Sequence, residues 1–271
     1  MMNADDSDTY RSLNAKLRAP RTMQTKRTVR TLKLICGLTA CLLPGGLFAQ
    51  TSDAKKLMVR EKFVEAAESY RAECMRQSAV ACWSGLGAAL MGQKAHPQAV
   101  VAFERALQTA GTAAPARTRA ALHANLGLAY LYDRRQVQAE QQYQQALKLD
   151  QNCVPALTNY GIYWIKAGQY ERGKKLLLRV LKIEPDYFFA YLFLGYAQYR
   201  AGNLESALAL MDRARKLNAG SFELYYYRAQ VRYKTRDPGG ALADLDRADR
   251  IRPGNALTGE LRRKIMREHL R

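Results

Sequence analysis

The sequence repeats itself with a step of 34 residues. Small residues recur at this step in two series twelve positions apart, Gly127, Gly161, Gly195 and Ala229 in the first and Ala139, Gly173, Ala207 and Ala241 in the second. A large apolar residue holds another position of the register, at Tyr143, Leu177, Met211 and Leu245. An earlier copy, displaced by a six-residue insertion near Pro115, supplies Gly87, Ala99, Phe103 and Ala106. This period predicts stacked copies of one small unit rather than a single core.

Each copy has the pattern of two helices. Apolar residues recur at helical spacing, first at Leu157, Tyr160, Gly161 and Trp164 and then at Leu177, Val180 and Leu181. The small positions mark the closest approach of the two helices, because a large side chain there would hold them apart. Proline inside a helix costs about 3 kcal/mol. All six prolines after residue 50 fall at expected helix starts or turns: Pro97, Pro115, Pro155, Pro185, Pro238 and Pro253.

These residues resemble the tetratricopeptide repeat, a helix–turn–helix unit of 34 residues. The resemblance implies an all-α solenoid of about five to six repeats with a C-terminal capping helix. The units expected are a degenerate repeat at 50–79, full repeats at 80–113, at 114–153 with the insertion in front, at 154–187, at 188–221 and at 222–255, and the cap at 256–271. In the cap, Leu257, Leu261 and Ile265 form an apolar face, and Arg262, Arg263, Lys264 and Arg267 a basic one.

Residues 1–49 have the pattern of a polar leader and a secretory signal peptide. Four basic residues precede the apolar run Leu34–Leu43, and a cleavage site follows at Ala49. Counting from Met23 gives a signal of ordinary length, which makes Met23 a candidate start. The residues that end at Cys41 resemble a lipoprotein processing site. We therefore expect an exported, periplasmic protein or, if Cys41 is lipidated, an outer-membrane lipoprotein.

The net charge of +19 suggests a polyanion-binding protein at first sight. The leader, however, carries eight of the 43 Lys/Arg and three of the 24 Asp/Glu, which leaves +14 for the rest, and +7 of this lies in residues 188–271. The excess is thus a C-terminal bias. Nucleic-acid or polyanion binding remains an alternative function, but we expect no nucleic-acid partner for an exported chain.

In the family that the sequence resembles, the first helix of each pair faces a concave groove. Carried over by position, the resemblance predicts that the groove is lined by Leu128, Tyr132, Ile162, Lys166, Tyr196, Tyr199, Arg200, Tyr226, Tyr233 and Lys234. Leu192 falls at another groove position. A tyrosine-rich floor with a cationic edge suits a peptide that carries apolar anchors and acidic groups. The alternative is that these tyrosines only pack in the solenoid and the cations form a solvated face.

No motif of a known catalytic or cofactor site occurs, so we expect a non-enzymatic chain without cofactor or metal. His123 takes a core-type position. Asp244, Asp246 and Asp249 alternate with arginines, as on a solvated helix. The expected function is a protein-interaction scaffold or adaptor of the periplasm or envelope. The alternatives are an assembly factor similar to the tetratricopeptide lipoproteins of type IV pilus biogenesis, and a regulatory subunit of an envelope enzyme.

Three cysteines follow the leader. Cys74 and Cys82 flank the turn expected between the degenerate repeat and the first full one. An oxidising compartment would permit a disulfide between them, and two buried free thiols are the alternative. Cys153 is left unpaired in both cases.

Overall fold

The computed structural model describes residues 52–60 and 62–269, and every regular element in that part of the chain is an α-helix. The predicted signal peptide, with Met23 and Cys41, lies outside these residues. No helix of the described part is long and apolar enough to cross a membrane.

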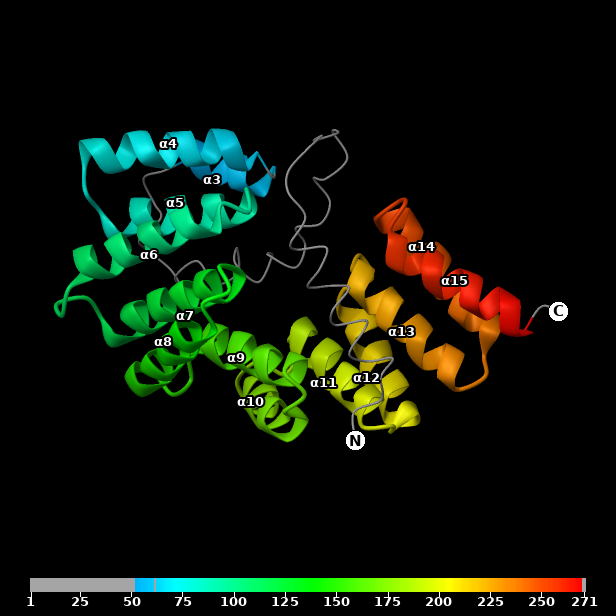
Figure 1. Cartoon of the computed structure of the whole chain (residues 1–271). Helices are drawn as coiled ribbons and strands as arrows, with labels where there is room; N and C mark the ends of the chain where they lie inside the picture. The colour runs from blue at the N-terminus through cyan, green and yellow to red at the C-terminus, as the bar shows by residue number, and fades with distance from the viewer. Residues whose placement is uncertain (1–51, 61, 270–271) are drawn as a thin grey trace. The chain divides into compact units, whose positions relative to one another are not determined.

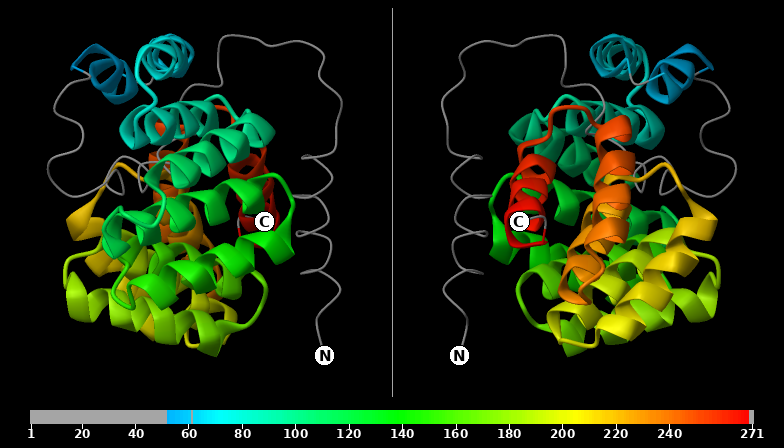
Figure 2. Two further views of the ribbon diagram at one scale, coloured as in Figure 1. Left: turned by 90° about the vertical axis from the view of Figure 1, so that its left-hand side faces the viewer. Right: turned by 90° about the vertical axis from the view of Figure 1, so that its right-hand side faces the viewer.

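Twelve of the helices form six consecutive antiparallel pairs, and a last helix follows them (Figure 1). In chain order they are α3 (Ser52–Val59) with α4 (Phe63–Arg76), α5 (Val80–Gly92) with α6 (His96–Ala110), α7 (Ala116–Tyr132) with α8 (Gln136–Leu149), α9 (Val154–Lys166) with α10 (Tyr170–Ile183), α11 (Phe188–Arg200) with α12 (Leu204–Leu217), α13 (Phe222–Lys234) with α14 (Pro238–Ile251), and α15 (Ala256–His269). Each pair packs on the next, and successive pairs are turned relative to one another (Figure 2). The predicted all-α repeat solenoid is confirmed.

The turn inside the five pairs from α5–α6 to α13–α14 has one conformation that recurs along the chain. The first helix ends in a residue with positive φ, at Lys94, Arg134, Gly168, Gly202 and Arg236. The N–H of the following residue then bonds a carbonyl five positions back, as from Ala95 to Leu90 at 2.9 Å. This is the Schellman motif, which satisfies carbonyls that the helix end leaves open. The same turn therefore connects the two helices in each of these five pairs.

The repeated positions of the sequence lie where the two helices of a pair meet. The large apolar position is fully buried in every full copy, at Phe103, Tyr143, Leu177, Met211 and Leu245. A Cβ atom added to Gly173 would lie 2.5 Å from the carbonyl oxygen of Gly161, so α9 and α10 touch backbone to backbone. The small residues therefore permit the close approach on which the pairs depend.

The insertion near Pro115 lengthens one helix. Pro115 caps the N-terminus of α7, which has 17 residues where α9, α11 and α13 have 13. Four of the six extra residues thus add about one turn to α7, while α6 and the Gly111–Pro115 turn are each one residue longer than their counterparts, and the register of the repeat is kept.

Cys74 and Cys82 form a disulfide that joins α4 to α5, with their Cα atoms 5.5 Å apart. Cys153 is a free, buried thiol before α9, and burial raises its pKa to about 11.

The terminal helix α15 continues the stack. Ile265 is fully buried against α13 and α14. Arg262 does not belong to a solvated basic face, as the sequence suggested, because its guanidinium contacts Asp246 at 2.8 Å and Asp249 at 2.9 Å. The spacing showed only that Arg262 lies opposite the apolar stripe of α15. The two aspartates come from α14, whose position the sequence did not show.

Candidate functional site

The first helices α7, α9, α11 and α13 carry the side chains that the sequence assigned to a groove. All ten keep part of their surface exposed, in contrast to the core positions of the same helices. Leu192 is the exception among the assigned positions. It is fully buried, so its assignment to the groove is wrong. In α11 this position faces the neighbouring helices, because the aromatic side chains beside it take up the exposed stripe.

Aromatic rings from α11 and α13 form a continuous cluster at these positions. The rings of Tyr196 and Tyr227 lie 4.6 Å apart, and Tyr227 also contacts Tyr226 at 5.9 Å and Phe193 at 6.5 Å. Tyr199 lies 6.3 Å from Tyr196. We call these five residues the aromatic cluster. Four of them are partly exposed tyrosines, and Phe193 forms the buried floor.

Tyr227 is the residue of this cluster that sequence reasoning missed. It follows Tyr226 directly and occupies no groove position of the repeat, yet it is the ring that joins α11 to α13. The run of three tyrosines at 225–227 was the available signal. Spacing within one helix did not show which of the three would reach the neighbouring repeat.

Two of the predicted cations lie on this cluster. The Lys166 ammonium is 5.8 Å from the centre of the Phe193 ring. The Arg200 guanidinium donates a hydrogen bond to the Tyr196 hydroxyl at 3.0 Å and lies over the Tyr196 and Tyr170 rings. Lys234 is exposed at the end of α13. Lys166 and Arg200 thus provide positive charge directly beside a hydrophobic surface.

The protonation states follow from the surroundings of these groups. Burial raises the pKa of Tyr226 to about 12 and raises that of Tyr227 further. Both phenols are therefore neutral at physiological pH. The surrounding helices displace water from Lys166 and lower its pKa, while the Glu223 carboxylate acts in the opposite direction.

Three other predicted groove residues have different surroundings. Tyr132 stacks on His96 at 5.2 Å, and Leu128 packs against the core around α5–α8. Tyr233 donates a hydrogen bond to Glu268, and its ring lies 5.5 Å from the Lys264 ammonium, so α15 covers part of it. The cluster with Lys166 and Arg200 is therefore the part of the predicted groove that the structure brings together.

Comparison with known proteins gives the same fold. The model of the tetratricopeptide repeat family matches residues 165–231. A tetratricopeptide repeat protein from Parabacteroides merdae superposes with a TM-score of 0.60 at 18% identity, over 80% of this chain and 84% of that one. Residues 165–231 thus match the tetratricopeptide repeat, and the described chain has the fold of tetratricopeptide-repeat proteins.

Two further solved structures share the fold of these tetratricopeptide repeats. A chain of the APC/C hetero-tetramer Cut9–Hcn1 superposes with a TM-score of 0.70 at 16% identity, over 79% of this chain and only 41% of that one. PilF of Pseudomonas aeruginosa gives a TM-score of 0.57 at 21% identity, over 76% of this chain and 85% of that one. No curated protein sequence matches the chain significantly.

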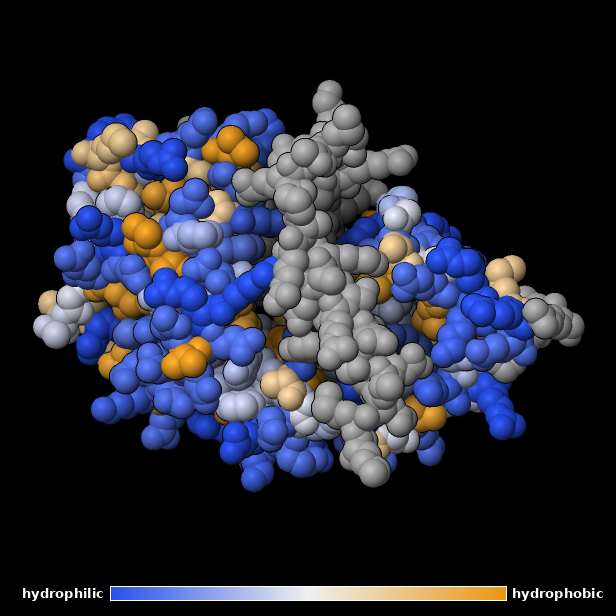
Figure 3. Space-filling model, viewed as in Figure 1, coloured by the Kyte–Doolittle hydropathy of each residue, from blue (hydrophilic) through white to orange (hydrophobic). Residues whose placement is uncertain are grey.

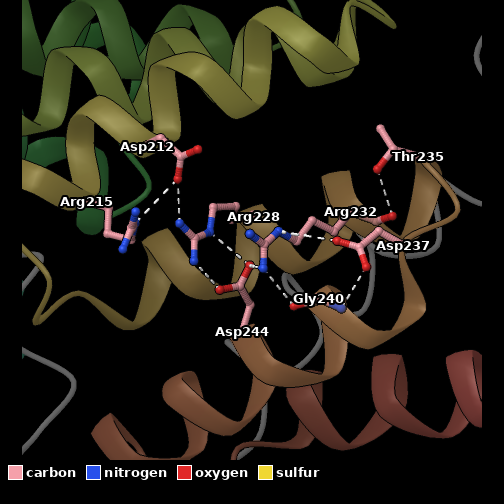
Figure 4. Close-up of polar contacts among 8 residues, drawn as sticks. All are labelled: Asp212, Arg215, Arg228, Arg232, Thr235, Asp237, Gly240 and Asp244. Carbon is pink, nitrogen blue, oxygen red and sulfur yellow. Dashed lines mark hydrogen bonds and ion pairs between the residues drawn. The ribbon is translucent and has the colours of Figure 1, made fainter.

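An ionic network joins the last two tetratricopeptide repeats and fixes α13, the helix that carries Tyr226 and Tyr227 (Figure 4). Arg228 of α13 is 5% exposed and donates two hydrogen bonds to Asp244 of α14, of which the Nε bond measures 2.9 Å. It also donates to Asp212 of α12 at 2.6 Å. Arg232 lies 3.3 Å from Asp244. Three helices are thus held around one guanidinium.

The interpretation of Asp244 as a solvated residue is wrong. It is 2% exposed, whereas Asp246 and Asp249 bond Arg262 nearer the surface. The alternating charges of α14 gave the pattern of a solvated helix. They did not show that Arg228 approaches one of these faces from α13.

The metal-ligating side chains of these repeats and two of the histidines have the following surroundings. Within the described residues, no group of three His, Cys, Asp or Glu side chains is arranged to hold a metal ion. His123 Nδ1 lies 2.7 Å from the side-chain oxygen of Gln142. His96 is stacked on Tyr132, and burial lowers its pKa.

Proposed function

We propose that the chain is a non-enzymatic scaffold that binds a segment of a protein partner on the aromatic cluster of α11 and α13. The observation that carries this proposal is the contact between Tyr196 and Tyr227, two partly exposed rings from successive repeats, with Arg200 bonded to one of them. Large aromatic side chains held by their neighbours bind a partner with little loss of conformational freedom.

The chemistry of the cluster indicates the kind of segment it would bind. The four partly exposed tyrosine rings, which pack on the buried Phe193, offer a hydrophobic surface for an apolar side chain. Lys166 and Arg200 lie on the same surface and favour a carboxylate next to that anchor. We therefore propose an extended or helical peptide with apolar anchors and acidic groups. The signal-peptide pattern of residues 1–49 supports a partner in the periplasm or envelope.

Site-specific photo-crosslinking in intact cells tests the proposal. A photoreactive phenylalanine derivative at Tyr196 should capture one or a few proteins. The same group at Val137, which is 69% exposed on α8, is the control. If both positions capture the same proteins in the same yield, the aromatic cluster is not the binding site.

Peptide selection then tests the chemistry of the captured segment. Tyr227→Ala should weaken binding of selected peptides by at least tenfold, because it removes the ring that connects the two repeats. Lys166→Glu should shift the selection away from acidic sequences. An unchanged selection with Lys166→Glu would remove the cation from the recognition model and leave the hydrophobic part.

A further inference from the structure

The outer face of α10 carries an unusual combination of charge and exposed apolar surface. The helix contains five Lys or Arg and one Glu. Leu178 is 43% exposed at the middle of this face. On a helix, residues three and four positions apart are neighbours. Leu178 is therefore surrounded by Lys174, Lys175 and Lys182, at i−4, i−3 and i+4.

The lysines of this face are available to a partner. Within the described residues, no carboxylate lies within the distance of an ion pair from Lys175 or Lys182, and both side chains are exposed. Lys174 contacts Glu171 at 3.6 Å. The helix packs mainly on α9 and α11, so the face with Leu178 is not covered by another part of the described chain (Figure 1).

Val137, which is more exposed than Leu178, lacks this surrounding. Val137 on α8 has Arg134 and Glu140 three positions away on either side. In the view of Figure 3 the surface is mostly hydrophilic, with small separate apolar patches. A single exposed leucine would need no explanation. A leucine surrounded by three ammonium groups fits a partner whose surface carries negative charges and has an apolar layer beneath them.

We propose that the outer face of α10 docks on an anionic lipid surface. The lysine ammonium groups would contact lipid phosphates, while Leu178 would enter the boundary between headgroups and acyl chains. A nucleic acid offers the same phosphates but no apolar layer for Leu178. The aromatic cluster lies on the first helices, so this surface is independent of the proposed peptide site.

Vesicle binding of the full-length chain tests this proposal. The chain should bind phosphatidylglycerol-containing vesicles and lose affinity as salt rises. Each lysine near an anionic leaflet contributes about fivefold, so Lys175→Gln with Lys182→Gln should weaken binding about 25-fold. The matched control, Arg247→Gln with Arg250→Gln, removes the same charge from exposed positions of α14 and should have little effect. The leader is common to all variants and cancels in the comparison.

A local probe separates docking from general attraction. The fluorescence of Leu178→Trp should shift to shorter wavelength on anionic vesicles, and that of Val137→Trp should not. The proposal is wrong if the Leu178→Trp emission stays unchanged, if both double variants weaken binding equally, or if neutral vesicles bind as well. It is also wrong if duplex DNA binds in a Lys175- and Lys182-dependent way while vesicles do not.

Discussion

Replacement of Asp244 by alanine should strongly destabilise the C-terminal repeats. The substitution removes two hydrogen bonds from Arg228 and leaves this guanidinium 5% exposed with Asp212 as its remaining carboxylate partner. Removal of one partner of a buried ion pair costs about 3–5 kcal/mol. We expect about 3 kcal/mol, because the contact of Arg228 with Asp212 persists.

Asp246 provides the matched control. It lies two residues further on α14, its side chain is 58% exposed, and its partner Arg262 also holds Asp249. Asp246→Ala should therefore cost less than about 1 kcal/mol. For a chain of this size, the difference corresponds to a change in Tm of several degrees, at about 2–4 °C per kcal/mol.

Urea unfolding followed by circular dichroism measures both variants, and hydrogen exchange shows where the loss occurs. Because each repeat contacts mainly its neighbours, the added exchange in Asp244→Ala should appear in α12, α13 and α14 while α5–α8 stay protected. If Asp244→Ala and Asp246→Ala lower the free energy of unfolding equally, the network does not fix these repeats and the reasoning is refuted.

Three further predictions concern backbone geometry and pH. Gly173→Ala should lower the free energy of unfolding in urea by about 1–3 kcal/mol, because the new methyl group would meet a carbonyl oxygen of α9 at 2.5 Å. Gly239→Ala is the control and should be close to neutral, because no atom lies within 4 Å of its Cβ position. Arg236→Gly should stabilise by about 1 kcal/mol, since Arg236 has φ of 59°, and Gly202→Arg at the equivalent turn should do the opposite. Folding raises the pKa of the Cys153 thiol from 9.0 to about 11, so above pH 9 the unfolded chain loses a proton that the folded chain keeps. The free energy of unfolding should therefore fall by up to about 1.4 kcal/mol per pH unit. Cys153→Ala should reduce this slope.

The aromatic cluster was predictable in part. The resemblance to the tetratricopeptide repeat, carried over by position, identified Tyr196, Tyr199, Tyr226 and Arg200 as groove residues. It did not identify Tyr227, whose role depends on the angle between α11 and α13. Nor did it show that α15 covers part of Tyr233, because that contact joins residues 35 positions apart.

The sequence by itself determined the repeat unit. The period of 34, the small residues of each pair and the placement of prolines are local constraints, and each of them follows from the steric requirements of two helices in contact. The large apolar position is buried in every full copy for the same reason.

Tertiary structure decided which charges and rings act together. Asp244 and Asp246 are alike in the sequence, yet one is buried on Arg228 and the other is half exposed, because only packing places α13 against one face of α14. In the same way, the stacking of successive repeats selects Tyr227 from three consecutive tyrosines and leaves Leu178 uncovered among its lysines. Contacts between repeats depend on the rotation from one pair to the next, which no periodicity within a pair specifies.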